Sequence, residues 1–309
     1  MRGPSPSRLA LAALAALVPW SWFLLRDVLG GAGDVIAILM PAIALLVVCA
    51  LAVAGIRWRL AWLAAASTLL MTAVAVLSTW LPADTGPVAA GRAITVAAAN
   101  VDGGTAAIDT VVGLSADVLV ISEVSYDMDD VLTERYPHEY SERNSRPKVG
   151  VYSRLPLTSV TGSSDNLPGM RIELATPSGP VVLYALHVPR PWPAGSQTGA
   201  FQATVGEHRE LIDDFARRAA AETVPTMVVG DLNAADRSSD YRVLLEDGQL
   251  VDAMRHGWVG PTSTTKWAPL LLRIDHLLVS EGWCGDAADS FDLPGSSHRG
   301  ITATVGPCR

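Results

Sequence analysis

The sequence predicts a layered α/β sandwich preceded by three membrane-spanning helices. The first part of the chain consists almost entirely of long uncharged stretches, whereas residues 92–309 alternate between short apolar runs and amphipathic stretches. In this second part the strand-like runs outnumber the helical ones. That proportion fits a layered sandwich better than a doubly wound parallel sheet.

The three uncharged stretches are Leu9–Leu25, Val35–Ile56 and Leu60–Ala83. A helix needs about 20 apolar residues to cross a bilayer core, and the second and third stretches reach that length. The first is shorter and contains Pro19. A cleaved signal peptide is the alternative for the first stretch, but no small-x-small cleavage pattern follows it. Since buried helices of a soluble domain would each show a polar face, we expect a three-span membrane anchor over residues 1–84.

The basic residues of the anchor predict its orientation. They lie before the first span and between the second and third spans: Arg2, Arg8, Arg57 and Arg59. The loop between the first and second spans instead holds Arg26 against Asp27 and Asp34. The positive-inside rule therefore places the N-terminus in the cytoplasm, and three crossings bring the rest of the chain to the outer face. We expect a multi-pass protein of the cell membrane with an extracytoplasmic C-terminal domain.

A linker over residues 85–91 is predicted to join the anchor to a single domain over residues 92–309, which is long enough to bury a substantial core. This domain contains 18 Lys and Arg against 28 Asp and Glu, a net charge of about −10. Proteins that hold nucleic acid along its length show a basic face, so nucleic acid is not the expected partner. A linker of about ten residues keeps the domain within tens of ångströms of the bilayer, where it meets lipid headgroups.

Cysteine usage agrees with export. Cys49 lies inside the second span, where a small apolar side chain is unremarkable. Cys284 and Cys308 are the two cysteines of the domain. In an oxidising compartment they could pair and tie down the C-terminal tail, but the sequence leaves open whether their geometry permits a bond.

Eight apolar runs of the domain are typical of strands: Ile94–Val101, Asp117–Val124, Val149–Arg154, Met170–Ala175, Val181–Val188, Thr226–Leu232, Arg273–Ser280 and Ile301–Val305. Three stretches are predicted to be helical: Thr105–Leu114, Phe201–Ala221 and Asp240–Leu245. In the second of these, Val205, Leu211, Ile212 and Phe215 lie on one side and the charges elsewhere.

Polar side chains close or interrupt several of these strands: Asn100, Glu123, His187, Asp231 with Asn233, Asp275 with His276, and His298. One such residue is usually a satisfied buried group or a turn former, but turns do not explain the whole set. Ligands of open α/β sheets bind at such strand ends. Oxygen ligands suit a hard cation such as Mg²⁺, and imidazoles suit the charge that develops on phosphoryl oxygens. The set therefore predicts hydrolysis of a phosphoester.

The order and spacing of these residues resemble the endonuclease/exonuclease/phosphatase superfamily, from about Ile94 to Val305. The resemblance rests on short pieces in a specific order: Asn100, Ser122-Glu123-Val124, Gly150-Val151-Tyr152-Ser153-Arg154-Leu155-Pro156-Leu157, His187, Gly230-Asp231-Leu232-Asn233, Arg273-Ile274-Asp275-His276 and Ser296-Ser297-His298-Arg299. It implies a four-layer α/β sandwich.

The resemblance also implies a divalent metal, Mg²⁺ or alternatively Mn²⁺. Glu123 would be its principal ligand, with Asn100 beside it. Asp231 would orient or deprotonate the attacking water, as a suitably placed carboxylate can. Asn233 would position the phosphate.

Two histidines complete the implied site. His187 and His298 would stabilise phosphoryl oxygens, and Asp275 would orient His298. The chain departs from the family where Ser297 stands in place of an Asp that helps to hold the metal or its water, and Gly300 replaces a Pro. A neutral hydroxyl there would weaken metal binding or slow turnover. Because the other residues of the set are intact, we expect a working hydrolase.

Three spans ahead of such a domain resemble a bacterial membrane-anchored branch linked to teicoplanin-type glycopeptide resistance. This resemblance implies a lipid-linked phosphate or pyrophosphate of the cell envelope as substrate. The segment 187–193 adds Arg190 and the interface-preferring Trp192 beside His187. An ordinary Pro-rich surface loop is the simpler interpretation of that segment.

Two alternative functions remain open. The first is an extracellular nuclease, against which the negative charge of the domain argues, although Arg143, Arg146 and Arg190 could cluster. The second is a catalytically silent module that binds a phosphorylated ligand, and Ser297 is its only support in the sequence.

Overall fold

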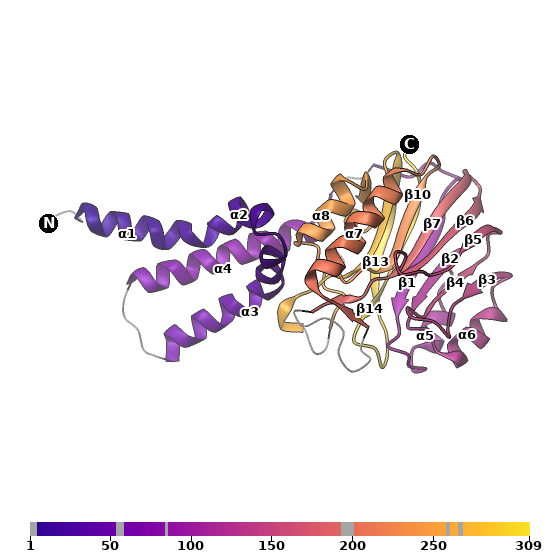
Figure 1. Cartoon of the computed structure of the whole chain (residues 1–309), viewed down its shortest axis with the longest axis horizontal. Coiled ribbons are helices and arrows are strands. Elements are labelled where there is room, and N and C mark those ends of the chain that lie inside the picture. Colours follow the sequence, from indigo (N-terminus) through magenta and orange to yellow (C-terminus); the bar gives the residue numbers. More distant parts are fainter. Residues whose placement is uncertain (1–4, 54–58, 84–85, 193–200, 258–259, 265–267) are drawn as a thin grey trace.

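The computed structural model describes residues 5–53, 59–83, 86–192, 201–257, 260–264 and 268–309. Figure 1 shows a bundle of long helices at one end and a sandwich of sheets and helices at the other. Arg2 and Arg57, on which part of the predicted orientation rests, lie outside the described residues, as does Pro193 at the end of the Pro-rich segment.

Four helices form the anchor: α1 (Pro6–Leu17), α2 (Ser21–Leu29), α3 (Gly31–Val53) and α4 (Arg59–Trp80). A 3₁₀ turn, η1 (Val18–Trp20), separates α1 from α2, because Pro19 lacks the N–H that would continue the helix. Three stretches are long and apolar enough to cross a membrane: Leu9–Arg26, Gly31–Val53 and Arg59–Trp80. The prediction of three such helices is confirmed.

Two six-stranded sheets form the sandwich, in the orders β13-β14-β1-β2-β4-β3 and β11-β12-β10-β7-β6-β5. The first sheet consists of β1 (Ile94–Asn100), β2 (Val118–Ser122), β3 (His138–Ser141), β4 (Val149–Ser153), β13 (Trp283–Asp292) and β14 (Arg299–Pro307). The second consists of β5 (Leu157–Thr161), β6 (Gly169–Thr176), β7 (Gly179–His187), β10 (Thr226–Asp231), β11 (Leu250–Asp252) and β12 (Asp275–Ser280). The short strands β8 (Arg190–Pro191) and β9 (Gln202–Ala203) pair with each other.

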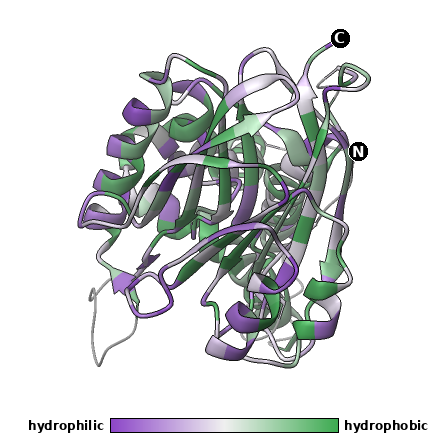
Figure 2. Ribbon diagram, turned by 90° about the vertical axis from the view of Figure 1, so that its right-hand side faces the viewer, coloured by the Kyte–Doolittle hydropathy of each residue, from purple (hydrophilic) through white to green (hydrophobic). Residues whose placement is uncertain are grey.

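Helices cover the outer faces of both sheets. The helical elements of the domain are α5 (Ile108–Val112), α6 (Tyr126–Thr133), α7 (Val205–Ala220), α8 (Ser239–Glu246) and the 3₁₀ turns η2 (Ala253–His256) and η3 (Ala268–Leu270). One apolar core lies between the sheets, a second under α5 and α6, and a third under α7 and α8. In Figure 2 the inner strands are mainly green, and the covering helices alternate between green and purple. The predicted four-layer α/β sandwich is confirmed.

Two predicted helices are shorter than expected. The helix predicted over Thr105–Leu114 forms only over α5. The helix predicted from Phe201 begins at Val205, because Thr204 caps it: the Thr204 hydroxyl accepts the N–H of Glu207, and the Glu207 carboxylate accepts the N–H of Thr204.

The anchor packs directly against the domain. Asp34, in the first turn of α3, accepts hydrogen bonds from the backbone N–H and the hydroxyl of Ser239 at 2.6 and 2.5 Å. Asp236 accepts hydrogen bonds from Trp80 Nε1 at 2.7 Å and from the Thr79 hydroxyl at 2.9 Å. The N-terminal end of α3 and the C-terminal end of α4 are therefore fixed to the domain by buried polar contacts.

A buried arginine joins α3 to the domain at a helix defect. Pro41 lies inside α3 and provides no N–H for the carbonyl of Ala37. Arg237 Nε donates to that carbonyl at 2.6 Å, and the same guanidinium donates to Ile38 O at 3.2 Å. It also donates to the carbonyls of residues 270 and 271 at 2.6 and 2.9 Å. One charged group thus satisfies carbonyls of both the anchor and the domain.

A disulfide joins Cys284 and Cys308, whose Cα atoms are 5.0 Å apart. Val88, within the predicted linker, forms a β-bridge with Cys308. The entry to the domain and its C-terminal tail are thus held together. Cys49 is a free, exposed cysteine of α3.

Candidate active site

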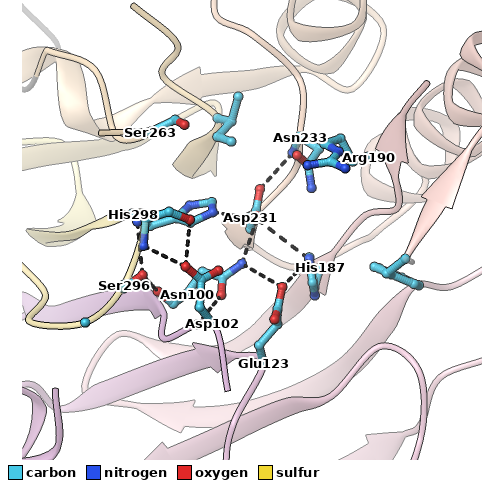
Figure 3. Close-up of a pocket in the computed structure, with 14 residues that line it drawn as sticks. Asn100, Asp102, Glu123, His187, Arg190, Asp231, Asn233, Ser263, Ser296 and His298 are labelled. Carbon is cyan, nitrogen blue, oxygen red and sulfur yellow. Dashed lines mark hydrogen bonds and ion pairs between the residues drawn. The ribbon is translucent and has the colours of Figure 1, made fainter. Parts of the chain in front are cut away.

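A cleft of about 750 Å³ lies where the ends of the central strands of both sheets meet. β1 runs parallel to β2, and β7 runs parallel to β10, so each pair ends at one edge of its sheet. β14 and β12 run antiparallel to β1 and β10 and therefore begin at the same edge. Six of the seven predicted site residues line the cleft (Figure 3): Asn100, Glu123, His187, Asp231, Asn233 and His298. The seventh, Asp275, contacts His298.

Asn100 connects the two carboxylates that the sequence placed at the centre of the site. Its side-chain amide donates to Asp231 Oδ2 at 2.9 Å and to Glu123 Oε1 at 3.4 Å. Burial, and next the charge of Asp102, raise the pKa of Glu123. Negative charge is therefore concentrated at this end of the cleft, where a cation would be stabilised.

Asp231 is held rigidly at the end of β10. Its Oδ1 accepts the N–H of Asn233 at 3.0 Å. Gly230 has φ = 134°, and a Cβ there would collide with the carbonyl oxygen of Leu186, so only glycine allows this strand end. Burial, and next the charge of Asp275, raise the pKa of Asp231. A carboxylate with a raised pKa is a stronger base towards a bound water.

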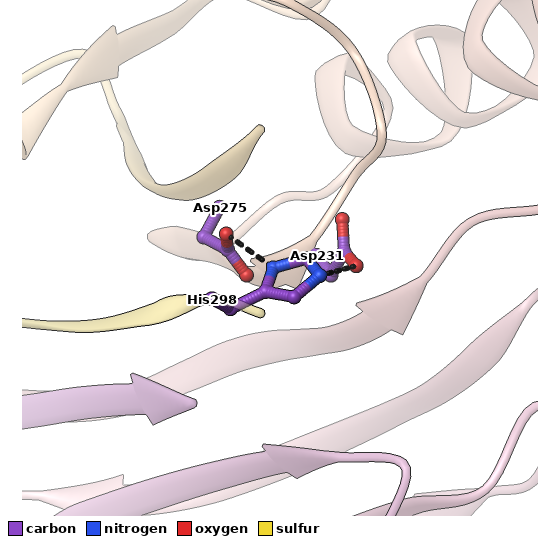
Figure 4. Close-up of side chains that lie close together, drawn as sticks. All are labelled: Asp231, Asp275 and His298. Atoms are coloured by element: carbon purple, nitrogen blue, oxygen red, sulfur yellow. Dashed lines mark hydrogen bonds and ion pairs between the residues drawn. The ribbon is translucent and has the colours of Figure 1, made fainter. Parts of the chain in front are cut away.

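His298 and Asp275 form a hydrogen-bonded pair on the other side of Asp231 (Figure 4). His298 Nδ1 lies 3.0 Å from Asp275 Oδ2, and its Nε2 lies 3.8 Å from Asp231 Oδ2. Burial disfavours the protonated ring, but Asp275 and Asp231 together outweigh it and raise the pKa of His298 to about 10. The ligand atoms of the three residues lie within 4.8 Å of one another, as in a metal cluster. A metal binds only the neutral imidazole, so the same cluster can pair a protonated His298 with two carboxylates or, once the ring has lost its proton, hold a cation.

His187 has the opposite character. It is buried, and this burial lowers the pKa of its ring, which is therefore neutral at pH 7. Its Nε2 lies 3.8 Å from Glu123 Oε1 and 3.7 Å from Asp231 Oδ2, and its ring packs against Phe201 at a centroid distance of 4.8 Å. Within the described residues, the buried Nδ1 has no hydrogen-bond partner. A neutral ring in this place can donate one N–H to a phosphoryl oxygen.

Asp102 also lines the cleft, although the sequence did not single it out. The backbone N–H and the hydroxyl of Ser297 both donate to Asp102 Oδ2 at 2.6 Å. The N–H of Asp102 in turn donates to Asn100 Oδ1 at 3.0 Å. A carboxylate therefore stands beside Ser297, where the family pattern led us to expect an Asp. The sequence offered one indication of Asp102 as a site residue, because it is an acid two residues after Asn100. Gly103 and Gly104 follow it, however, and such a segment is typical of an ordinary turn.

Three residues of the cleft have a left-handed backbone. The φ angles are 49° at Asp102, 55° at Glu123 and 49° at Asn233. Such a conformation costs a non-glycine residue about 1–3 kcal/mol and is concentrated at functional sites. Here it turns the carboxylates and the carboxamide into the cleft immediately after strands that must remain in register.

The donor set at this end of the cleft fits a divalent cation. Glu123 and Asp102 offer carboxylate oxygens, and Asn100 offers a carboxamide oxygen, which are the ligands of hard cations. The raised pKa of Glu123 reflects its burial and the neighbouring charge of Asp102. These three residues would hold the ion, and a positive charge there would relieve the repulsion between the carboxylates.

His276 does not belong to the site. Its Nε2 lies 2.8 Å from Ala234 O, and its ring packs on Tyr241 at 5.0 Å. Because side chains alternate along β12, His276 points away from the cleft when Asp275 points towards it.

Besides Asp102 and Ser297, the polar residues that line the cleft without having been predicted as site residues are Arg190, Ser263 and Ser296. The Ser296 hydroxyl donates to Asn100 O at 2.7 Å and accepts the N–H of His298 at 3.0 Å. It therefore ties the segment before β14 to the end of β1.

Solved structures share the fold. The endonuclease/exonuclease/phosphatase from Beutenbergia cavernae DSM 12333 is 17% identical with a TM-score of 0.52, and the match covers 70% of this chain and 72% of that one. A variant of the 3′ phosphatase NExo from Neisseria, bound to a product DNA hairpin, is 16% identical with a TM-score of 0.52, over 68% and 98% of the two chains. Humanized D. rerio TDP2 is 12% identical with a TM-score of 0.56, over 69% and 99%.

These identities are low, so the structural matches show the fold alone. No curated protein matches the chain. The family profile is decisive, because it matches residues 97–298, well over half of the chain and nearly the whole sandwich. The chain belongs to the Endonuclease/Exonuclease/phosphatase family.

Proposed function

We propose that the protein is a Mg²⁺-dependent phosphoesterase that hydrolyses a lipid-linked phosphate or pyrophosphate of the cell envelope at the outer face of the cytoplasmic membrane. One observation carries this proposal: the loop that follows the catalytic strand β10 is also the loop that binds the anchor. Asn233 lines the cleft, and Arg237, a few residues later, hydrogen-bonds to the backbone of α3. A substrate in the cleft therefore lies beside a membrane-spanning helix.

The side chains of the cleft have complementary roles in attack on phosphorus. Asp231 accepts a proton from the attacking water, and its raised pKa favours that step. The protonated ring of His298 and an N–H of the neutral His187 donate to phosphoryl oxygens as their charge grows. When bound, the cation neutralises and orients the phosphate. The P–O bond to the leaving group breaks and its electron pair stays on the leaving oxygen. A lipid alcohol takes a proton from His298, which then recovers the proton that Asp231 removed from the water, since His298 Nε2 lies 3.8 Å from Asp231 Oδ2; a lipid monophosphate leaves as the anion.

Two features of the anchor and the domain support the proposed location on the outer face. The domain contacts Asp34 at the start of α3 and Trp80 at the end of α4. Arg59, at the start of α4, lies at the opposite end of that helix. The positive-inside rule then favours an outward-facing domain. The disulfide between Cys284 and Cys308 agrees with an oxidising compartment.

The two alternatives have less support. The Neisseria neighbour is a phosphatase bound to DNA, but at 16% identity it shows a shared fold and no shared substrate. Arg143 pairs with Asp129 and Asp130 and does not line the cleft, so no cluster with Arg190 forms there. A silent binding module was suggested by Ser297, and the carboxylate of Asp102 now stands beside that residue.

The test is phosphate release by the full chain in detergent. Undecaprenyl pyrophosphate and double-stranded DNA are offered separately, each with Mg²⁺ and with EDTA. We expect Mg²⁺-dependent release from the lipid, reduced about 10²- to 10⁴-fold in Asp231→Asn because the base is lost. Asp127→Asn, which removes an exposed carboxylate of α6, is the matched control. Cleavage of DNA without release from the lipid would favour a nuclease, and inactivity on both would favour a silent module.

A further inference from the structure

A second hollow lies beside the catalytic cleft, between α3 and the domain. It consists of two adjoining pockets of about 110 and 220 Å³. Its walls are mainly apolar side chains of α3, of the segment after β7 and of the segment before β12: Ile38, Leu39, Trp192, Leu270, Leu272 and Ile274. We call this hollow the apolar groove.

The apolar groove adjoins the cleft. Four residues line both: Arg190, Asn233, Ser263 and Ile274. A single molecule could therefore occupy both spaces with its polar end among the catalytic residues and its apolar end against α3.

Arg190 marks the border between polar and apolar surroundings. Its Nε is buried and has no hydrogen-bond partner in the part of the chain that the structure describes. Its guanidinium carbon lies 5.9 Å from the centre of the Trp192 ring. An arginine with a free donor beside a phosphate-binding cleft is suited to hold an oxygen of a phosphate. Trp192, 42% exposed, is suited to the boundary between headgroups and hydrocarbon.

The apolar groove also continues along the membrane-spanning part of α3. Leu39 lines the groove and is 40% exposed, and Ile43 and Leu46 follow it with exposures of 43% and 68%. These spacings of four and three residues place the three side chains on one face of the helix. An apolar stripe therefore runs from the groove into the stretch of α3 that is long and apolar enough to cross a bilayer.

We propose that the apolar groove holds the first part of the hydrocarbon chain of a membrane lipid phosphate while its phosphate lies in the cleft beside Arg190. The proposal rests on the proposed phosphoesterase function and adds a basis for substrate choice. A lipid is the occupant that fits, because the groove adjoins a helix whose exposed face is itself lipid-facing in a bilayer. The chain of a lipid phosphate reaches the groove from the bilayer along the stripe, with its headgroup at the level of Trp192. Water-soluble phosphates would leave the groove unused and lose its apolar contacts.

The test compares two tryptophan substitutions of exposed leucines in α3. Leu39→Trp adds bulk inside the groove, whereas Leu45→Trp adds the same bulk on another face of the helix, outside the groove and off the stripe. The full chain is placed in nanodiscs of phosphatidylethanolamine and phosphatidylglycerol and supplied with Mg²⁺. Phosphate release is measured from undecaprenyl pyrophosphate and from isopentenyl pyrophosphate, which share a headgroup and differ in chain length. Because partition of the long chain into the bilayer is the same for every variant, only the change in the ratio of the two rates is interpreted.

We expect Leu39→Trp to lower the ratio of long-chain to short-chain rates roughly tenfold, about the effect of losing two buried methylene groups. Leu45→Trp is expected to leave the ratio as in the parent chain. An unchanged ratio in Leu39→Trp, with hydrolysis retained, would overturn the groove and leave the phosphoesterase standing.

A second measurement tests the groove even if Leu39→Trp does not fold or the protein hydrolyses neither pyrophosphate. A phosphatidic acid with a diazirine close to the carboxyl end of one acyl chain is photolysed with the parent chain, and the labelled peptides are identified by mass spectrometry. Labelling around Leu272 and Trp192 that undecaprenyl phosphate competes away is the expected result, and it would support the groove even if neither pyrophosphate were hydrolysed. Absence of label from both peptides would reject the groove whatever the hydrolysis assay gives.

Discussion

Replacing Asp102 with asparagine is expected to weaken divalent-metal binding by about 10- to 100-fold, the usual cost of losing a group that supports a metal site. Asn keeps the left-handed backbone that Asp102 adopts at φ = 49°, so the change removes the charge with little effect on the turn. The expected loss follows from geometry. Asp102 lines the cleft, its charge acts on Glu123, and Ser297 donates two hydrogen bonds to its carboxylate.

The companion change, Ser297→Asp, restores the acid that the family pattern led us to expect. In the parent chain it brings a second carboxylate close to Asp102 Oδ2, which now accepts from the Ser297 hydroxyl at 2.6 Å. Two unit charges about 4 Å apart repel by about 1 kcal/mol in water and about 4 kcal/mol in a protein-surface environment. Because Asp102 is exposed, we expect the metal-free protein to lose about 1–2 kcal/mol of stability, and Mg²⁺ to relieve that loss.

The double variant Asp102→Asn, Ser297→Asp then decides the question. If the two positions supply one carboxylate between them, the double variant recovers most of the metal affinity that Asp102→Asn loses, and the two changes are strongly non-additive. Calorimetric titration of the full chain with Mg²⁺ and Mn²⁺ measures this directly, with Asp127→Asn as a matched charge control. Affinity unchanged by Asp102→Asn, or a double variant no better than that single one, would refute the reasoning.

Three further outcomes follow from buried contacts. The pKa of His298 is raised from 6.5 to about 10, so the stability that its positive charge contributes is fully present below pH 6.5 and is lost as the pH rises through about 10. Asp275→Asn removes one of the charges that raise this pKa and should move the loss of stability to lower pH. The melting temperature and the hydrolysis rate, each measured as a function of pH, check this. Arg237→Ala leaves four carbonyls without their charged donor and should lower the free energy of unfolding by about 3–5 kcal/mol. Backbone hydrogen exchange should become faster around residues 234–239, while the amides of β1 remain protected. Cys308→Ser opens a loop with a sequence separation of 24 and should lower the free energy of unfolding by about 3–4 kcal/mol. Equal melting temperatures of Cys308→Ser and the parent chain, both measured without reductant, would argue against the bond.

The strands that the sequence predicted are the central strands of both sheets, and the ones it did not predict are their edges. The eight predicted runs became β14, β1, β2 and β4 of one sheet and β12, β10, β7 and β6 of the other. The edge strands are β13, β3, β11 and β5. A central strand is buried on both faces and is therefore a continuous apolar run. An edge strand such as β13, with its bulge between Asp286 and Asp289, keeps polar residues and has no simple period.

The site was predictable to the extent that strand ends determine it. Asn100, Glu123, His187 and Asp231 directly end strands or follow them by one residue. Parallel pairing brings Asn100 and Glu123 to one edge of the first sheet and His187 and Asp231 to one edge of the second. The packing of the two sheets then brings the two edges together. Asp102 lies in a turn beyond β1, and Arg190 lies in the two-residue strand β8, which pairs with β9 outside both large sheets. Neither position follows from the ends of the central strands. A neutral residue at Ser297 was the one hint that a carboxylate had to come from elsewhere.

The relation between anchor and domain could not be inferred from the sequence, because a Pro- and Gly-containing stretch after the third span suggests a flexible tether. Pro41 alone would predict only a distorted helix. The structure pairs the carbonyl that Pro41 leaves unsatisfied with Arg237, whose guanidinium is almost completely buried. Burial of the Arg237 guanidinium carries a desolvation cost, because an undocked arginine would be hydrated by water. This cost is offset only while the interface with α3 is formed, which indicates a permanent interface. A permanently docked anchor keeps the wall that α3 contributes to the groove at a fixed distance from Asn233. The same contact that fixes the N-terminal helices to the domain thus shapes the space next to the candidate catalytic residues.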